Sequence, residues 1–369
     1  MSEFYIGLMS GTSLDGIDAA LIDFSDIKPK FVAFDYSPYE PTFKARLARL
    51  TSAQQPILLE DYGTIDTQLG RQFAQSVLNL LSKANIPSQT IKAIGSHGHT
   101  VYHAPGLKSA FSLQIGDPNI IAETTGITTV ADFRRRDIAA KGQGAPLVPA
   151  FHHAFFGTPQ ENRVVVNIGG IANITVLPGT HIDKVIGFDT GPGNGLMDQW
   201  IKQHKNLDFD ANGDWARSGQ LLTAVMTQLL DDVYFDNPAP KSTGKEYFSL
   251  DWLRKKVKGL ADYNPKDIQC CLCHLTAQSI ADAIKRYAYQ TDLILICGGG
   301  VHNAFLMDLL KQKAGCKVLS TEYYNLHPDH VEATAFAWLA RQTMNHQPGN
   351  LASVTGANKA VVLGAIYQG

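Results

Sequence analysis

The feature that most constrains the fold of this sequence is an order of strand-like segments that occurs twice. Near the N-terminus, an apolar run, a glycine-containing turn and two further apolar runs follow one another, at residues 4–9, 10–16, 17–24 and 30–36. The same order returns at residues 164–168, 169–170, 171–177 and 184–189. Gly11 then corresponds to Gly169, and Asp35 to Asp189. Such self-similarity indicates an internal duplication; the alternative is a coincidence between two β-rich segments.

A duplicated strand–turn–strand–strand unit predicts two α/β lobes with a ligand in the cleft between them. Helical periodicity and short apolar runs place the remaining elements. The expected helices are 42–50, 59–83, 193–204, 219–233, 266–289, 303–313 and 328–341, and the further strands are 91–95, 111–115, 127–130, 293–297 and 316–320. We expect an N-terminal lobe of residues 1–130, to which residues 345–369 return, and a C-terminal lobe of residues 131–344.

Composition excludes several classes of protein. The 369 residues carry 32 Lys and Arg against 34 Asp and Glu, so the basic surface of a nucleic-acid-binding protein is not expected. The longest apolar runs, such as residues 293–297, are far shorter than the roughly 20 residues of a membrane helix. Five Cys residues fit a reducing compartment. The sequence therefore predicts a soluble, cytoplasmic protein that binds neither nucleic acid nor membrane.

The 32 glycines cluster in loops that suit a phosphate. In the first loop, glycine permits close backbone approach to an anion, and hydroxyls can donate to phosphate oxygens. This loop consists of Gly11, Thr12, Ser13, Leu14, Asp15, Gly16, Ile17 and Asp18. Asp15 and Asp18 would repel a bare phosphate, so we expect Mg²⁺ to lie between them and it. The alternative is an ordinary hairpin whose Gly and Asp only form the turn.

Two further glycine loops extend this pattern. Their candidate nucleotide-binding residues are Asn167, Gly169, Gly170 and Asn173 in one loop, and Gly298, Gly299, Gly300 and Asn303 in the other. The second follows an apolar strand and is expected to open a helix, whose N-terminus suits a phosphate. No P-loop or Rossmann pattern occurs in its required context, since Ser242-Thr243-Gly244-Lys245 lacks the upstream glycine.

The sequence resembles a known protein family over essentially the whole chain. The sequence resembles anhydro-N-acetylmuramic acid kinases in the segments MSGTSLDGID, SHGHTVYH, DFRRRD, KGQGAPLVP, NIGGIANIT, GFDTGPGN, CGGGVHN and ASVTGANKAVVLGAIYQG. One departure is Lys141, where similar sequences are expected to have Gly. The resemblance implies an α/β fold of two duplicated actin/hexokinase-like (ribonuclease H-like) lobes with a central ATP cleft. It also implies a homodimer.

The resemblance further implies the chemistry. ATP and Mg²⁺ would serve to open 1,6-anhydro-N-acetylmuramic acid with water and to phosphorylate its 6-oxygen, in peptidoglycan recycling. The attacking water needs a general base, and Asp189 matches the family's catalytic aspartate; its alternative role is to cap the following helix. The candidate sugar-binding residues are His97, Thr100, Arg134, Asp137 and Glu332. Without the resemblance, Arg134 would be interpreted as a surface cation and Glu332 as a solvated helix residue.

Three alternatives stay open at this stage. The histidines and the group Cys270, Cys271, Cys273 and His274 could bind zinc, although the cysteines follow a helical pattern typical of core residues. A related sugar kinase with an unblocked hydroxyl acceptor would need no hydrolysis. A non-catalytic ATP-binding switch would turn over nucleotide without regard to sugar.

Overall fold

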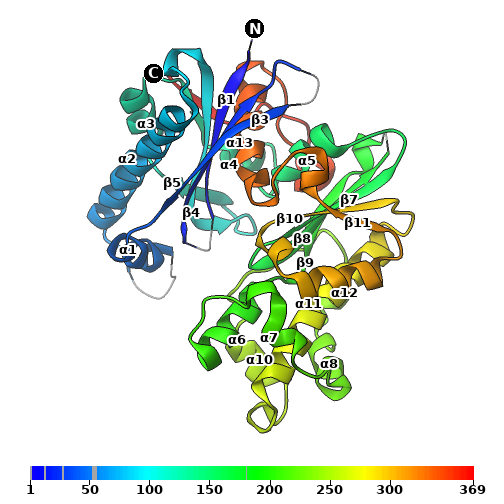
Figure 1. Ribbon diagram of the computed structural model, residues 1–369. Helices are drawn as coiled ribbons and strands as arrows, with labels where there is room; N and C mark the ends of the chain where they lie inside the picture. The colour runs from blue at the N-terminus through cyan, green and yellow to red at the C-terminus, as the bar shows by residue number, and fades with distance from the viewer. Residues whose placement is uncertain (1, 12–13, 27–28, 52–55, 180) are drawn as a thin grey trace. The chain divides into compact units, whose positions relative to one another are not determined.

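The computed structural model describes residues 2–11, 14–26, 29–51, 56–179 and 181–369. Its contacts divide the chain into two units (Figure 1). Unit 1 consists of Met1–Phe155 and His330–Gly369, and unit 2 consists of Phe156–Asp329. The division differs from the expected lobe boundaries at residues 130 and 344, because the segment after β6 and the helix α13 pack in unit 1.

The sheet of unit 1 is built around the first predicted hairpin. Its strand order is β12-β6-β4-β1-β2-β3, with β5 paired to β4. β1 and β2 are antiparallel, as are β2 and β3, whereas β4 runs parallel to both β1 and β6. The strands are β1 (Phe4–Ser10), β2 (Gly16–Asp23), β3 (Lys30–Pro38), β4 (Ile91–Ala104), β5 (Phe111–Ile115), β6 (Thr129–Ala131) and β12 (Ala365–Tyr367). The C-terminal strand β12 pairs with β6, so the tail belongs to this unit.

The sheet of unit 2 repeats that topology. Its order is β11-β10-β7-β8-β9, with β7, β8 and β9 antiparallel and β10 parallel to β7 and β11. The strands are β7 (Asn162–Ile168), β8 (Ile171–Pro178), β9 (Ile186–Pro192), β10 (Leu293–Cys297) and β11 (Lys317–Ser320). The path β3-β2-β1-β4-β6 of unit 1 therefore has the same order and directions. This match confirms the duplicated α/β lobes and excludes a coincidence of β-rich segments.

Helices cover both faces of the sheet in unit 1. One face packs α1 and α2 through residues such as Leu47 and Phe73, and the other packs α13 through residues such as Phe336. The helices are α1 (Pro41–Thr51), α2 (Leu59–Ala84), α3 (Pro118–Thr125), α4 (Phe133–Ala139), α5 (Val148–Phe156), α13 (Val331–Met344) and α14 (Ala352–Thr355). α13 lies directly on the strands: a Cβ at Gly7 would be 1.8 Å from the carbonyl oxygen of Ala333. That close approach is why residues 330–344 belong to unit 1.

The core of unit 2 forms between its sheet and the long helix α11. The helices are α6 (Gly195–Lys205), α7 (Asp214–Arg217), α8 (Thr223–Leu230), α9 (Val233–Asp236), α10 (Leu250–Lys256), α11 (Pro265–Tyr287) and α12 (Ala304–Ala314). Cys271 and Cys273 of α11 lie in the core, with no exposed surface. Across the described residues, no group of His, Cys, Asp and Glu could hold a metal ion, which argues against the zinc alternative.

Short 3₁₀ helices complete the secondary structure. They are η1 (Ser88–Thr90), η2 (Ile182–Lys184), η3 (Ala211–Gly213), η4 (Leu260–Asp262), η5 (Gly299–His302), η6 (Thr321–Tyr324) and η7 (Pro328–His330). Within the described part of the chain, none of the helices has the length and apolar character needed to cross a bilayer.

Candidate active site

Asp189 is a half-buried carboxylate fixed from several directions within unit 2. It lies on β9, and its Oδ2 accepts the backbone N–H of Thr243 at 3.0 Å. Its own N–H donates to the carbonyl oxygen of Lys241 at 3.0 Å, and its carbonyl oxygen accepts the hydroxyl of Tyr234 at 2.7 Å. The side chain does not cap a helix, because α6 begins at Gly195 with Asn194 in the cap position.

Burial raises the pKa of Asp189 to about 6, against the opposing effect of the Thr243 N–H. At neutral pH the carboxylate is still mostly ionised, and its affinity for a proton is higher than that of an exposed aspartate. A general base works best when its pKa lies near the working pH. The environment therefore suits Asp189 to take a proton from water.

The Gly169-Gly170 turn is tied to the loop that follows Asp189. The carbonyl oxygen of Gly170 accepts the N–H groups of Gly193 and Gly195, at 3.0 and 3.1 Å, and that of Gly169 accepts the N–H of Asn194 at 2.8 Å. A Cβ at Gly193 would lie 2.3 Å from the Gly169 oxygen, so only glycine allows this approach. The two glycine clusters that the sequence separates thus form one structure next to the base.

The third glycine loop reaches its helix through an extra turn. The sequence predicts that the loop of residues 298–303 leads into a helix at 303–313, and α12 begins at Ala304, with η5 occupying part of the loop. Asn303 is the cap of α12, where its Oδ1 accepts the N–H of Leu306 at 2.9 Å. The predicted helix after the glycine loop is therefore confirmed.

A pocket of about 340 Å³ opens beside this turn. It is formed by α6, the segment after it and η5, and is lined by Asn194, Met197, Asp198, Phe209, Asp210, Asn212, Gly299, His302 and Asn303. Asn167 and Asn173 face each other across β7 and β8, and a Cβ at Gly298 would meet Asn167 Oδ1 at 2.3 Å. The pocket has apolar and amide groups suited to a planar base and a ribose.

The corresponding hairpin of unit 1 joins β1 to β2. Thr12 and Ser13 lie outside the described residues. The carbonyl oxygen of Gly11 accepts the N–H of Leu14 at 3.2 Å, and Gly16 begins β2. Ile17 has no exposed surface and its side chain belongs to the core, so a contact with nucleotide would have to come from its backbone.

Asp15 and Asp18 remain suited to a hard cation. Asp15 forms an exposed ion pair with Lys44 at 2.9 Å, which contributes little and can be exchanged. Both carboxylates act on one neighbour, since their negative charge adds to burial in raising the pKa of Tyr36. Mg²⁺ binds carboxylate oxygens together with water molecules. Asp15 and Asp18 of the β1–β2 hairpin offer two such carboxylates.

A buried polar network holds the end of β1, directly before this hairpin. Ser10 Oγ is 2.6 Å from Tyr39 Oη and 2.9 Å from His99 Nδ1. All three side chains are buried, and burial lowers the pKa of His99 to about 4, so the imidazole is neutral. The network gives the first hairpin a rigid base. Sequence reasoning missed it, because the three residues are far apart in the chain.

Three of the predicted sugar-binding residues meet in unit 1. His97 Nδ1 faces the carbonyl oxygen of Gly98 at 2.9 Å, and Nε2 lies 2.9 Å from Nη2 of Arg134. Burial and the guanidinium hold the pKa of His97 well below its usual value, so Nε2 accepts from Arg134. Burial lowers the pKa of Arg134 to about 10, with Glu332 and Asp137 opposing, and the group stays cationic.

Glu332 is the carboxylate that faces this cation. Burial raises the pKa of Glu332, and the Arg134 charge lowers it. It is therefore not the solvated helix residue of the alternative interpretation. Thr100 lies nearby on β4, where its Oγ1 accepts Gln114 Nε2 at 3.1 Å. His97 and Gln114 also line a pocket of about 210 Å³.

Asp137 does not join this group. It has no exposed surface, and its oxygens accept the N–H of Gly144 at 2.7 Å, Asn350 Nδ2 at 2.6 Å and Thr355 Oγ1 at 2.7 Å. The prediction that it contacts the sugar is wrong, because both oxygens bind the protein. Lys141, in the loop held by Asp137, has a φ of 73°, the left-handed region that explains why Gly is expected there.

Comparison with known sequences identifies the family. A profile described as anhydro-N-acetylmuramic acid kinase matches residues 3–369. The chain belongs to the anhydro-N-acetylmuramic acid kinase family. Similar proteins of that name come from Coxiella burnetii (strain RSA 493), with 49% identity over 100% of this chain and 98% of the relative, and from Pasteurella multocida, with 49% identity over 99% and 96%. The Aliivibrio fischeri relative is 48% identical over 99% of each chain.

The solved structures that the chain resembles are far less similar to it in sequence. An ADPNP-bound activator of 2-hydroxyisocaproyl-CoA dehydratase from Clostridium difficile is 12% identical, with a TM-score of 0.46 over 93% of this chain and 97% of that one. A ROK family glucokinase from Streptomyces griseus in complex with glucose and AMPPNP is also 12% identical, with a TM-score of 0.42 over 92% and 99%. The fold of this kinase-family member is established by its own sheet topology.

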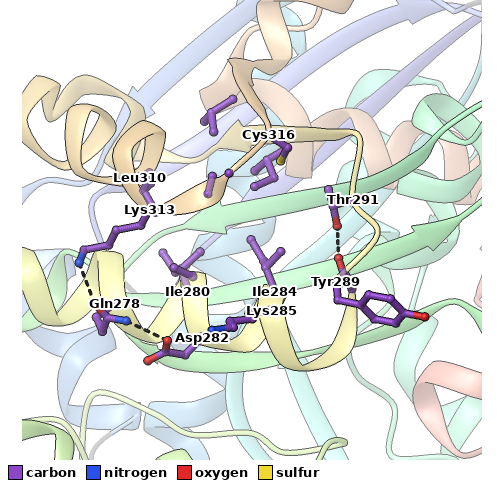
Figure 2. Close-up of a pocket in the computed structure, with 16 residues that line it drawn as sticks. Gln278, Ile280, Asp282, Ile284, Lys285, Tyr289, Thr291, Leu310, Lys313 and Cys316 are labelled. Carbon is purple, nitrogen blue, oxygen red and sulfur yellow. Dashed lines mark hydrogen bonds between the residues drawn. The ribbon is translucent and has the colours of Figure 1, made fainter.

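A third pocket, in unit 2 of this kinase-family chain, lies away from these loops. Figure 2 shows this cavity of about 550 Å³ between the C-terminal parts of α11 and α12, with Ile280 and Ile284 pointing into it. Lys313 Nζ donates to Gln278 at 2.7 Å, and Gln278 donates to Asp282 at 2.8 Å along its edge. It contains none of the predicted site residues.

Proposed function

We propose that this chain is an ATP-dependent kinase that opens the anhydro ring of 1,6-anhydro-N-acetylmuramic acid and phosphorylates its 6-oxygen. The products are N-acetylmuramic acid 6-phosphate and ADP, in peptidoglycan recycling. The observation that carries the proposal is the half-buried Asp189, with a pKa raised to about 6, beside the Gly169-Gly170 turn. Membership of the kinase family supports the substrate.

The 6-oxygen of this substrate is locked in an ether and has no proton to lose. A water molecule therefore attacks the anomeric carbon and gives its proton to Asp189. The bond from that carbon to the 6-oxygen breaks, and the 6-oxygen forms a bond to the γ-phosphorus as ADP leaves. The Thr243 N–H holds Oδ2 of Asp189, so that the other carboxylate oxygen is oriented toward the water. Base catalysis of this kind contributes roughly 10²–10⁴-fold.

Nucleotide contacts are assigned to each unit by itself. In unit 2, the pocket beside η5 would take the adenosine, and the Gly169-Gly170 turn would approach the phosphates. In unit 1, the β1–β2 hairpin is assigned to the phosphates. Asp15 and Asp18 would hold Mg²⁺, which supplies charge neutralisation on the phosphate oxygens when bound. The role of these residues in the protein is to place the phosphates in line with the acceptor.

Sugar recognition is assigned to the cluster in unit 1. Arg134 is a buried cation with a planar donor fork, suited to the lactyl carboxylate. Its orientation is fixed by His97 and by the carbonyl oxygen of Gly144, to which Nη1 donates at 2.9 Å. Thr100 and Glu332 would contact the sugar ring. We also propose a cytoplasmic homodimer, which light scattering and cell fractionation test.

The deciding experiment measures ADP release with ATP, Mg²⁺ and either the anhydro sugar or N-acetylmuramic acid, for the wild type and Asp189→Asn. We expect stimulation by the anhydro sugar only, and a loss of roughly 10²-fold or more in the variant, with nucleotide affinity retained. Solvent ¹⁸O should appear at the anomeric carbon.

Two outcomes would overturn the proposal. Turnover without ¹⁸O at the anomeric carbon would indicate an ordinary hydroxyl-acceptor kinase. ADP release that does not depend on the sugar and is not lowered by Asp189→Asn would indicate a non-catalytic ATP switch.

A further inference from the structure

The segment 241–245 of unit 2 runs beside the proposed base. Lys241 accepts the N–H of Asp189 through its carbonyl oxygen, and the Thr243 N–H donates to the Asp189 carboxylate, both at 3.0 Å. This segment includes the Ser242-Thr243-Gly244-Lys245 sequence that lacks the context of a P-loop. Its position beside Asp189 therefore indicates a role other than that of a P-loop.

The core of unit 2 fixes the segment at both ends. Lys241 Nζ donates to the carbonyl oxygen of Tyr234 at 2.8 Å. After the segment, Phe248 is 1% exposed, and its ring lies 5.4 Å from that of Tyr234 and 5.1 Å from that of Trp252. The intervening residues are thus held in place by packing.

Lys245 lies across the glycine turn. An ideal Cβ at Gly170 would be 2.4 Å from Cε of Lys245 and 3.3 Å from its Nζ, so the lysine occupies the space that a side chain at 170 would need. The carbonyl oxygens of the turn already accept the N–H groups of Gly193, Asn194 and Gly195. The ammonium group therefore lies at the face of the turn that the phosphates would approach.

We propose that Lys245 is a catalytic residue that binds the γ-phosphoryl group of ATP. This inference rests on the proposed function. Phosphoryl transfer places negative charge on the equatorial oxygens, and a fixed cation stabilises that charge. Lys245 keeps its proton throughout, while the 6-oxygen bonds to phosphorus, the bond to ADP breaks and the water proton goes to Asp189. One short segment thus orients the base through Thr243 and the phosphoryl group through Lys245.

The test compares Lys245→Met, Lys245→Arg and Gly170→Ala with a control, Lys285→Met. Lys285 is an exposed lysine of the same unit, at the Figure 2 pocket. We expect Lys245→Met to lower kcat by about 10²–10³-fold, as for the loss of one preorganised electrostatic group. Lys245→Arg should recover part of the rate. Gly170→Ala should lower the rate less, because it displaces the lysine without removing its charge.

Binding separates contact from a structural role. In calorimetric titrations, Lys245→Met should weaken the non-hydrolysable analogue AMPPNP several times more than ADP, while Lys285→Met changes neither. A Lys245→Met enzyme with a kcat within threefold of wild type would overturn the inference, and so would equal weakening of both nucleotides. If the anhydro sugar does not stimulate ADP release by the wild type, the proposed function is wrong. The comparison of AMPPNP binding with ADP binding still decides the role of Lys245.

Discussion

Replacing Asp137 should destabilise the protein strongly and weaken sugar binding only indirectly. Its carboxylate, with no exposed surface, accepts three hydrogen bonds, from Gly144, Asn350 and Thr355, and so joins α4 to the C-terminal tail. Each buried donor left without an acceptor costs about 1–3 kcal/mol. Asn350 Nδ2 and Thr355 Oγ1 each have a second, longer contact at 3.4 Å, which favours the lower end of that range. We expect Asp137→Ala to lose about 3–5 kcal/mol of unfolding free energy.

Thermal unfolding by calorimetry measures this loss. About 2–4 °C per kcal/mol corresponds to a fall in Tm on the order of 10 °C. The control is Asp26→Asn, which removes an exposed ion pair with Lys30 and should change the unfolding free energy by less than about 0.5 kcal/mol. KM for the sugar should rise by less than about tenfold below the transition, because Asp137 acts on the sugar site only through Gly144 and Arg134. An unchanged Tm with a raised KM would refute the reasoning and return Asp137 to the sugar site.

Two other predictions concern the base and the first hairpin. Because the pKa of Asp189 is raised to about 6, kcat/KM should fall about tenfold per pH unit below that value as the base becomes protonated; a pH–rate profile flat down to pH 4 would count against it. The stability of the folded state changes with pH in the opposite direction. Because the pKa of Asp189 is raised, the folded state binds this proton more tightly than the unfolded chain does, so the contribution of Asp189 to stability increases as the pH falls through about 6. Tyr39→Phe removes the hydroxyl near Ser10 and should cost about 1 kcal/mol of stability and raise KM for ATP, whereas the control Tyr289→Phe, at an exposed side chain of unit 2, should do neither. Equal KM values for the two variants would contradict the role given to the network.

The duplicated sheets could be predicted because each strand is specified by residues that are close together in the sequence. Each strand of the two meanders is a short apolar run bounded by glycine or polar turns, and β10 begins and ends as expected at Leu293 and Cys297. The position of Asp189 followed from the same pattern, since it lies on the third strand of the second meander. Periodicity is sufficient where a segment pairs with its neighbours in the chain.

The rest of the site depends on contacts between distant segments. Nothing near Asp137 indicates that Asn350 and Thr355 bind its carboxylate, and a charged residue in an Arg run looks exposed. The unit to which α13 belongs is decided by small residues, such as Gly7 and Ala333, that allow helix and strand to touch. The pocket beside η5 likewise depends on the fold to place Phe209, because the segment that contains this residue has no periodic pattern.

The order in which the chain is synthesised gives the division into units a consequence for biogenesis. Unit 2 is one continuous segment, Phe156–Asp329, whereas unit 1 is completed only by His330–Gly369. Domains generally fold from the N-terminus during synthesis. Here the central unit is complete first, while the strands translated earliest still lack α13 on one face and β12 at β6. A released fragment that ends at residue 329 should therefore contain a folded second unit and an unfinished, protease-sensitive first one.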